Sequence, residues 1–168
     1  MLTSFLLLSL STLSLALPTT SISSIDTCTT PSSFTISRFS KFTPSSSNPN
    51  PARVSFRYSD DSGLVSSSCL LMGSTSTGAY DPPVVCENPD VRFSFEGNQL
   101  TVWENLPACN TTEKAQVKGS IYVGTYCYPS PAGVPLGEGT SCQTPSVSLG
   151  GSLTAVGILG RKWNGMEW

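Results

Sequence analysis

The stretch VRFSFEGNQLTVWE, residues 91–104, decides the fold class of this chain. Apolar and polar residues alternate along both of its halves, which is the pattern of a β-strand with one buried face. The dipeptide Gly97-Asn98 separates the halves and is typical of a tight hairpin turn. The stretch therefore predicts an antiparallel hairpin whose inward-facing residues are Val91, Phe93, Phe95, Leu100 and Val102.

The same alternation recurs along the rest of the chain. Residues 53–71 predict a second hairpin, in which Val54, Phe56 and Tyr58 face inward and the turn is Asp60-Asp61-Ser62-Gly63. Further strands are predicted at residues 33–39, with Phe34 and Ile36 on one face, and at 115–127 and 147–159.

Segments rich in Gly, Pro, Ser and Asn separate these strands. Loops are expected at residues 41–52, 73–83 and 129–145, and a bend at Gly150-Gly151 within the last strand. Seven or more strands without a helical period predict an all-β fold, a single antiparallel β-barrel or sandwich.

Composition excludes several chemistries. The 168 residues include no histidine, which removes Ser-His-Asp and Cys-His nucleophilic sites and His-ligated zinc. Only 12% of the residues are charged and the net charge is −2, so we expect no nucleic-acid partner. Ser and Thr account for 47 residues, as in many β-rich secreted proteins.

The N-terminus predicts secretion. The leucine-dominated run at residues 5–17 is too short to span a bilayer, and Ser14 and Ala16 occupy the −3 and −1 positions of a cleavage site. A buried apolar strand or helix is the alternative interpretation. We expect a signal peptide at 1–16, an N-terminal segment at 17–32, a β-domain at 33–159 and a polar tail at 160–168, with no membrane anchor.

Six cysteines lie after the signal peptide, and an even number on a secretory route predicts a disulfide framework. The chain contains no Cys-x-x-Cys motif, and six cysteines allow fifteen pairings. Asn110-Thr111-Thr112 is an N-glycosylation sequon, which fits the same compartment.

Short motifs in a fixed order give the chain a family resemblance over residues 28–158. They are an aromatic-x-Ile-x-x-Phe strand at 34–39, a hairpin ending at Cys69, Cys86 ahead of Phe93-Ser94-Phe95, then Tyr126-Cys127 and Cys142-Gln143. This order resembles the fungal family of small secreted β-barrel proteins typified by the major Alternaria allergen, which includes elicitors of plant hypersensitive responses.

The resemblance implies a barrel of two antiparallel sheets without known enzymatic activity, found in allergens, elicitors or effectors, and binders of small phenolic ligands. It implies two intrachain disulfides, Cys69–Cys86 and Cys127–Cys142. In the family the early cysteine, here Cys28, can bridge two subunits. Because this chain also has Cys109, we expect Cys28–Cys109 pairing, and a covalent homodimer if those two do not pair.

No residue is assigned a catalytic or metal-binding role, and no cofactor is expected. Asp60 and Asp61 could form half of a hydrolytic carboxylate pair, but a turn favours acidic residues for backbone reasons. Glu96 and Glu104 flank the hairpin of residues 91–104 and could converge as a second carboxylate pair, but solvated strand ends are expected. Arg53 and Arg57 are expected on an outward face, as solubilising charges or as contacts to an acidic partner, and the candidate ligand-binding aromatics are Tyr122, Tyr126 and Trp103, together with Tyr80 and Tyr128.

Three functions remain open at this level. The first is a non-enzymatic secreted protein that acts at a host interface, with a host protein or a small phenolic compound as partner. The second is an extracellular carrier of phenolic or apolar molecules. The third is a small carboxylate-dependent hydrolase, against which the lack of histidine and the low acidic content argue.

Overall fold

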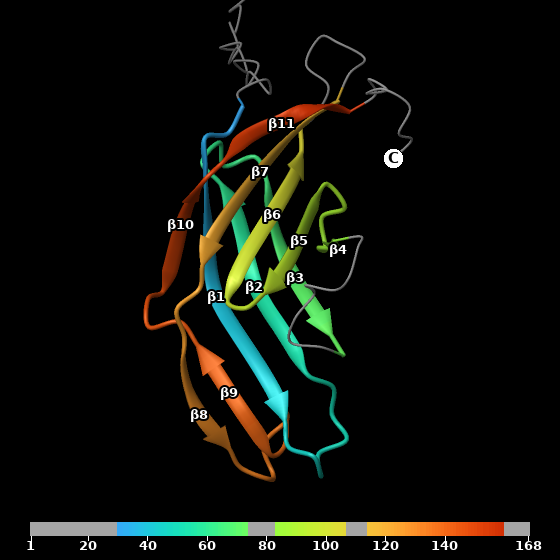
Figure 1. The fold of residues 1–168 in the computed structure, drawn as a ribbon, viewed down its shortest axis with the longest axis vertical. Helices are drawn as coiled ribbons and strands as arrows, with labels where there is room; N and C mark the ends of the chain where they lie inside the picture. Colours follow the sequence, from blue (N-terminus) through green and yellow to red (C-terminus); the bar gives the residue numbers. More distant parts are fainter. Residues whose placement is uncertain (1–29, 74–82, 107–113, 160–168) are drawn as a thin grey trace, which may run out of the picture.

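The computed structural model describes residues 30–73, 83–106 and 114–159. Eleven strands and no helix are formed in these segments, and all strand pairings are antiparallel (Figure 1). The all-β fold class is therefore confirmed. No pairing joins the two sheets within the described segments, so the architecture is a two-sheet sandwich.

The first sheet has six strands in the order β3-β2-β1-β9-β8, with β10 also paired to β1. The long β1 lies at its centre, because its first half pairs with β10 and its second half with β9 along the same edge (Figure 1). The strands are β1 (Ser33–Pro44), β2 (Arg53–Asp60), β3 (Ser66–Met72), β8 (Tyr126–Ser130), β9 (Gly139–Gln143) and β10 (Ser148–Ser152).

The second sheet has five strands in the order β11-β7-β6-β5-β4. Its hairpin β5–β6 is the one predicted from residues 91–104, and β2–β3 of the first sheet is the other predicted hairpin. The strands are β4 (Val84–Val85), β5 (Val91–Glu96), β6 (Gln99–Asn105), β7 (Lys114–Tyr122) and β11 (Thr154–Leu159).

Four sequence predictions of element boundaries are wrong. The expected loop at 41–52 begins with strand, since β1 continues to Pro44 and pairs there with Gly139. The expected strand at 115–127 is two strands, which belong to different sheets. The expected loop at 129–145 contains β9, and the last strand divides at Leu153, where the chain leaves β1 and joins β7.

The core fills the space between the sheets with aromatic side chains. Phe56 of β2 meets Phe93 of β5 edge-on, with ring centroids 4.9 Å apart, and Phe39 of β1 lies 5.4 Å from Phe95 of β5. Rings that cross between layers in this way stabilise the sandwich beyond their buried area. The inward-facing residues predicted for both hairpins are all buried.

Two glycines, Gly119 and Gly151, leave space for the Phe34 ring in the core. The role that the sequence predicts for Gly151 is instead a bend in the last strand. A Cβ atom on Gly151 would lie 2.5 Å from the Phe34 ring, and a Cβ on Gly119 of β7 would lie equally close to it. Phe34 is itself 2% exposed. Glycine is required at these two positions because the two sheets pack against the same ring.

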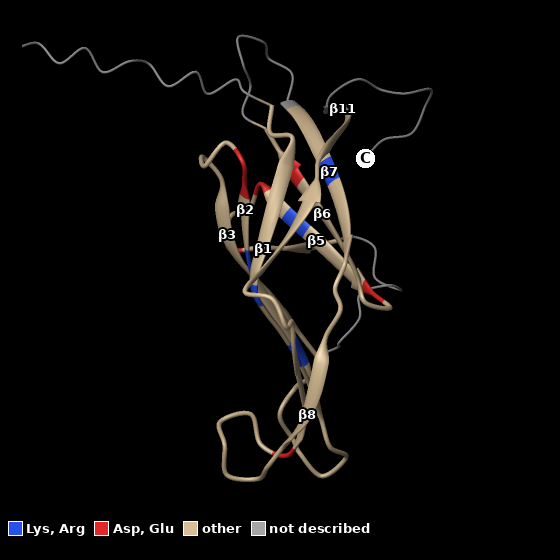
Figure 2. Ribbon diagram, turned by 90° about the vertical axis from the view of Figure 1, so that its left-hand side faces the viewer, with Lys and Arg blue, Asp and Glu red and all other residues tan. Residues whose placement is uncertain are grey.

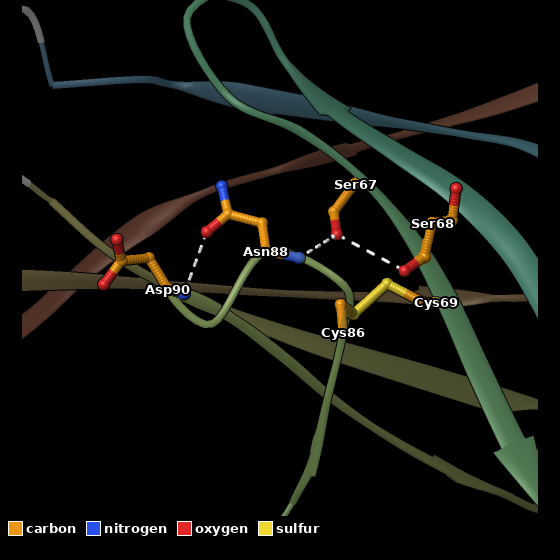
Figure 3. The surroundings of a disulfide bond; sticks show 6 residues. All are labelled: Ser67, Ser68, Cys69, Cys86, Asn88 and Asp90. Atoms are coloured by element: carbon orange, nitrogen blue, oxygen red, sulfur yellow. Dashed lines mark hydrogen bonds between the residues drawn. A yellow bond between two sulfur atoms is a disulfide. The ribbon is translucent and has the colours of Figure 1, made fainter.

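Two disulfides join the pairs that the family resemblance implied, Cys69–Cys86 and Cys127–Cys142. Cys69 lies on β3 of the first sheet and Cys86 follows β4 of the second, so this bond ties the edges of the two sheets together. Figure 3 shows its surroundings, where the Asn88 amide donates to Ser67 Oγ over 2.8 Å.

Candidate functional site

An exposed pair of tyrosines on β8 is the candidate recognition surface. The rings of Tyr126 and Tyr128 lie 6.3 Å apart on the same face of the strand and are 52% and 41% exposed. On the neighbouring β9, Gln143 donates an Nε2–H to Tyr128 Oη over 2.9 Å. We call Tyr126 and Tyr128 the tyrosine pair, and Gln143 lies beside it.

The strand beneath this surface is held firmly. Cys127, between the two tyrosines, pairs directly with Cys142 in the register of β8 and β9, and the two form a disulfide. At the far end of the hairpin, Ser130 Oγ donates to the Gly137 carbonyl. A surface fixed in this way loses little conformational freedom on binding, which favours affinity.

The other predicted aromatics lie elsewhere. Trp103 and Tyr122 both project from the outer face of the second sheet, on β6 and β7. Lys118, which pairs with Trp103, places its Nζ 5.1 Å from the indole centroid. Tyr122 lies four positions along β7 from Lys118, a span of about 13 Å along a strand, so Trp103 and Tyr122 do not form one binding surface.

A hydroxyl-rich depression of about 440 Å³ lies on the first sheet. Serines of β1, β2 and β3 contribute to its lining together with Arg57 and Glu87. Tyr58 also lines it, but its ring turns into the core, where it is 1% exposed. The depression therefore offers hydroxyl and charged groups rather than aromatic rings.

The expectation that Glu104 is a solvated strand end is wrong. Its side chain is 1% exposed and accepts a hydrogen bond of 2.5 Å from Tyr58 Oη across the sandwich. The other carboxylate oxygen, Oε1, has no hydrogen-bond partner in the described segments. Leu100 and Val102 face inward, and alternation along the strand places residue 104 on the same face. The sequence therefore did indicate burial of Glu104, although its charge favoured an exposed position.

Burial dominates the electrostatics of this pair. Desolvation raises the pKa of Glu104 to about 7, and the carboxylates of Asp60, Asp61 and Asp90 add to the rise, while the Tyr58 hydrogen bond opposes it. Desolvation, followed by the hydrogen bond to Glu104, raises the pKa of Tyr58 as well. Below pH 7 the Glu104 carboxyl and the Tyr58 hydroxyl are therefore both neutral in the folded protein. Ionising the buried carboxyl at higher pH destabilises the fold.

The remaining acidic candidates serve the backbone. Asp60 accepts hydrogen bonds from Ser62 Oγ and from the Gly63 and Val65 amides, which closes the β2–β3 turn. Asp61 accepts from the hydroxyl and amide groups of Ser32 and Ser33, and the Ser32 hydroxyl is the main reason that its pKa is lowered. Asp60 and Asp61 are therefore engaged in turn and strand contacts.

The other charged candidates are spread over the molecule. Glu96 is exposed, as expected of a strand end, and Arg57 is exposed on β2. Arg53 is half-buried rather than fully outward, with its Nε unpartnered in the described segments. Figure 2 shows the basic residues scattered along both sheets instead of gathered on one face.

Several predicted features lie outside the described residues. They are the signal peptide at 1–16, Cys28, Tyr80, Cys109, the sequon at Asn110 and the tail at 160–168. Within residues 30–73, 83–106 and 114–159, no three His, Cys, Asp or Glu side chains come together as metal ligands. The same segments contain no helix with the length and apolarity needed to cross a membrane.

Comparison with known proteins identifies the fold. No protein-family model and no curated protein matches the sequence. Two crystal structures of the Alternaria alternata major allergen Alt a 1 are similar to this chain. One matches 74% of this chain and 94% of the allergen, with a TM-score of 0.51 and 16% identity. The other matches 73% of this chain and 88% of the allergen, with a TM-score of 0.50 and 16% identity. The resemblance stated from sequence motifs is confirmed at the level of the fold.

Proposed function

We propose that this chain is a secreted, non-enzymatic recognition protein that acts at a host surface, in the manner of an elicitor, effector or allergen. The observation that carries the proposal is the exposed, disulfide-supported tyrosine pair on β8. Exposed tyrosines are enriched in protein interfaces because each combines a large apolar ring with a polar hydroxyl. The fold shared with Alt a 1 and the disulfides, which are typical of extracellular proteins, support the same reading.

The carboxylate-hydrolase alternative receives no support from the site geometry. Glycoside hydrolysis by two carboxylates needs both groups to flank an accessible substrate. Glu104 is sealed in the core against Tyr58, while Asp60 and Asp61 are engaged by the turn and by the start of β1.

A small aromatic ligand is the second candidate, favoured by the same pair of rings. A phenolic ring could stack on Tyr126 or Tyr128, and the amide of Gln143 offers a polar group beside them. The two candidates differ in what they need, because a host protein requires no bound small molecule.

The test is infiltration of purified protein into plant leaf tissue, with cell death scored against dose. We expect the double variant Tyr126→Ser/Tyr128→Ser to need at least tenfold more protein while its melting temperature stays within a few degrees of wild type. Met72→Ser is the matched control, since Met72 is 59% exposed on β3, in a different part of the first sheet.

Full activity of the double variant would overturn the role of the tyrosine pair, and inactivity of the wild type would overturn the elicitor proposal itself. Titration with a phenolic acid in a calorimeter separates the candidates. Binding heat in the wild type that is lost in the double variant supports the small-ligand function, whereas activity without binding heat supports direct contact with a host protein.

A further inference from the structure

The hydroxyl-rich depression on the first sheet has the composition of a binding site that the proposed function does not use. Register places Ser37 of β1 beside Arg57 of β2, and Arg57 beside Ser68 of β3. Ser59 and Ser66 form the next outward-facing pair. Because these residues alternate with buried ones along each strand, their side chains project together from the outer face.

Glu87 forms the wall of the depression at the edge of β3, and its position is fixed. It follows Cys86, which is bonded to Cys69, and its amide donates to the Ser68 carbonyl over 2.9 Å. The next amide, that of Asn88, donates to Ser67 Oγ (Figure 3). The carboxylate is therefore carried by a segment that is joined to β3 at three successive residues, by one disulfide and two hydrogen bonds from backbone amides.

The two charged groups of the depression have no partners in the described segments. Neither the Arg57 guanidinium nor the Glu87 carboxylate forms an ion pair or a side-chain hydrogen bond there. Arg57 offers a planar set of N–H donors, Glu87 offers acceptors, and each serine hydroxyl offers both. Ser67 Oγ is already engaged, because it accepts from the Asn88 amide and donates to the Ser68 carbonyl. The hydrogen-bonding capacity of Arg57, Glu87 and the outward-facing serines is available to a ligand.

The balance of groups indicates the class of ligand. One positive and one negative charge cancel, which disfavours a phosphate or sulfate as well as a cation. A sugar ring carries adjacent hydroxyls that both donate and accept, and it matches guanidinium, carboxylate and serine groups together. The volume of about 440 Å³ falls within the range of small-molecule sites.

We propose that this depression binds a neutral sugar residue of an oligosaccharide, with Arg57 and Glu87 as the two anchoring groups. Because no exposed aromatic ring lines it, stacking does not contribute and the affinity is in the millimolar range. The site lies over β1–β3 whereas the tyrosine pair lies on β8, so variants at one leave the other intact and failure of either proposal is distinguishable.

The experiment is a titration of the isotope-labelled full-length mature protein, followed by backbone amide NMR shifts. The probes are neutral oligosaccharides built from glucose, mannose, galactose or xylose, each at millimolar concentration, with inorganic sulfate in a separate arm. We expect at least one sugar to shift amides of residues 57–59, 66–68 and 87 in a saturable manner, and sulfate to leave them unmoved.

Arg57→Gln and Glu87→Gln are each expected to weaken the binding of that sugar by at least tenfold. The matched controls, Arg92→Gln and Glu96→Gln, remove exposed charges from β5 of the second sheet and are expected to bind like wild type. The proposal is overturned if no sugar shifts these amides, if sulfate shifts them instead, or if Arg57→Gln binds the sugar as well as Arg92→Gln does.

Discussion

Replacing the buried Glu104 by glutamine is expected to remove most of the pH dependence of stability between pH 5 and 8. The wild-type side chain has a pKa of about 7 in the folded state and an ordinary value of 4.5. Since the chain has no histidine, few other groups titrate in this window. The buried carboxyl group should therefore dominate it.

The direction follows from the raised folded-state pKa. Between pH 4.5 and 7 the unfolded chain releases this proton while the folded protein keeps it, so the free energy of unfolding falls as the pH rises. The slope is about 1.4 kcal/mol per pH unit and the total loss is about 3 kcal/mol, reached once the folded protein ionises as well. Stability is thus greatest below the unfolded-state pKa of Glu104 as far as this group is concerned.

Asp61 acts in the opposite direction and in a different window. Its pKa is lowered, chiefly by the Ser32 hydroxyl, so its contribution is present above its ordinary pKa of 3.8 and lost as the pH falls. The two effects are separable because that of Asp61 is confined to strongly acidic solution.

The assay is urea unfolding of the disulfide-intact protein at half-unit pH steps, for wild type, Glu104→Gln and Glu96→Gln. The glutamine carbonyl can still accept from Tyr58, so the slope with pH, rather than the absolute stability, is the readout. Glu96 is exposed at the end of β5 and serves as the matched control. A decline between pH 5 and 7 that persists in Glu104→Gln, or a wild type that gains stability over this range, would refute the reasoning.

Three further predictions concern packing and covalent structure. Gly151→Ala should lower the free energy of unfolding by about 1–3 kcal/mol, because the added Cβ atom meets the Phe34 ring. Gly150→Ala is the control, because its Cβ atom would have no neighbour closer than 3.8 Å, and it should change this free energy by about 0.5 kcal/mol or less. Thermal and urea unfolding measure both variants. The double variant Cys69→Ser/Cys86→Ser should lower the free energy of unfolding by about 3 kcal/mol in the same measurements, because the disulfide joins residues 17 positions apart and restricts the unfolded chain. A double variant as stable as wild type would contradict this entropic role. Peptide mapping of secreted, non-reduced protein should find Cys28 joined to Cys109 and no free thiol, and a disulfide-linked dimer would contradict that pairing.

The local alternation of the sequence determined which faces of the hairpins are buried. Val91, Phe93 and Phe95 face inward because successive side chains of a strand point to opposite sides, a rule that needs no knowledge of distant residues. Turn residues likewise fixed both hairpins. In the β5–β6 turn Gly97 has a φ of 53° and Asn98 a φ of 73°, and in the β2–β3 turn Gly63 has a φ of 71°, values that glycine and asparagine adopt at low cost. The all-β class and the antiparallel pairing of neighbouring strands followed from these signals.

Tertiary structure alone decided which sheet each later strand joins. Residues 148–152 pair with β1 and residues 154–159 pair with β7, yet both segments look like one strand because local alternation contains no term for a partner far along the chain. The fate of Glu104 was decided in the same way. Its position in the alternating strand predicts a buried side chain, whereas its charge predicts an exposed one. The hydroxyl of Tyr58, 46 residues away in the sequence, donates the hydrogen bond that offsets part of the desolvation penalty of burial.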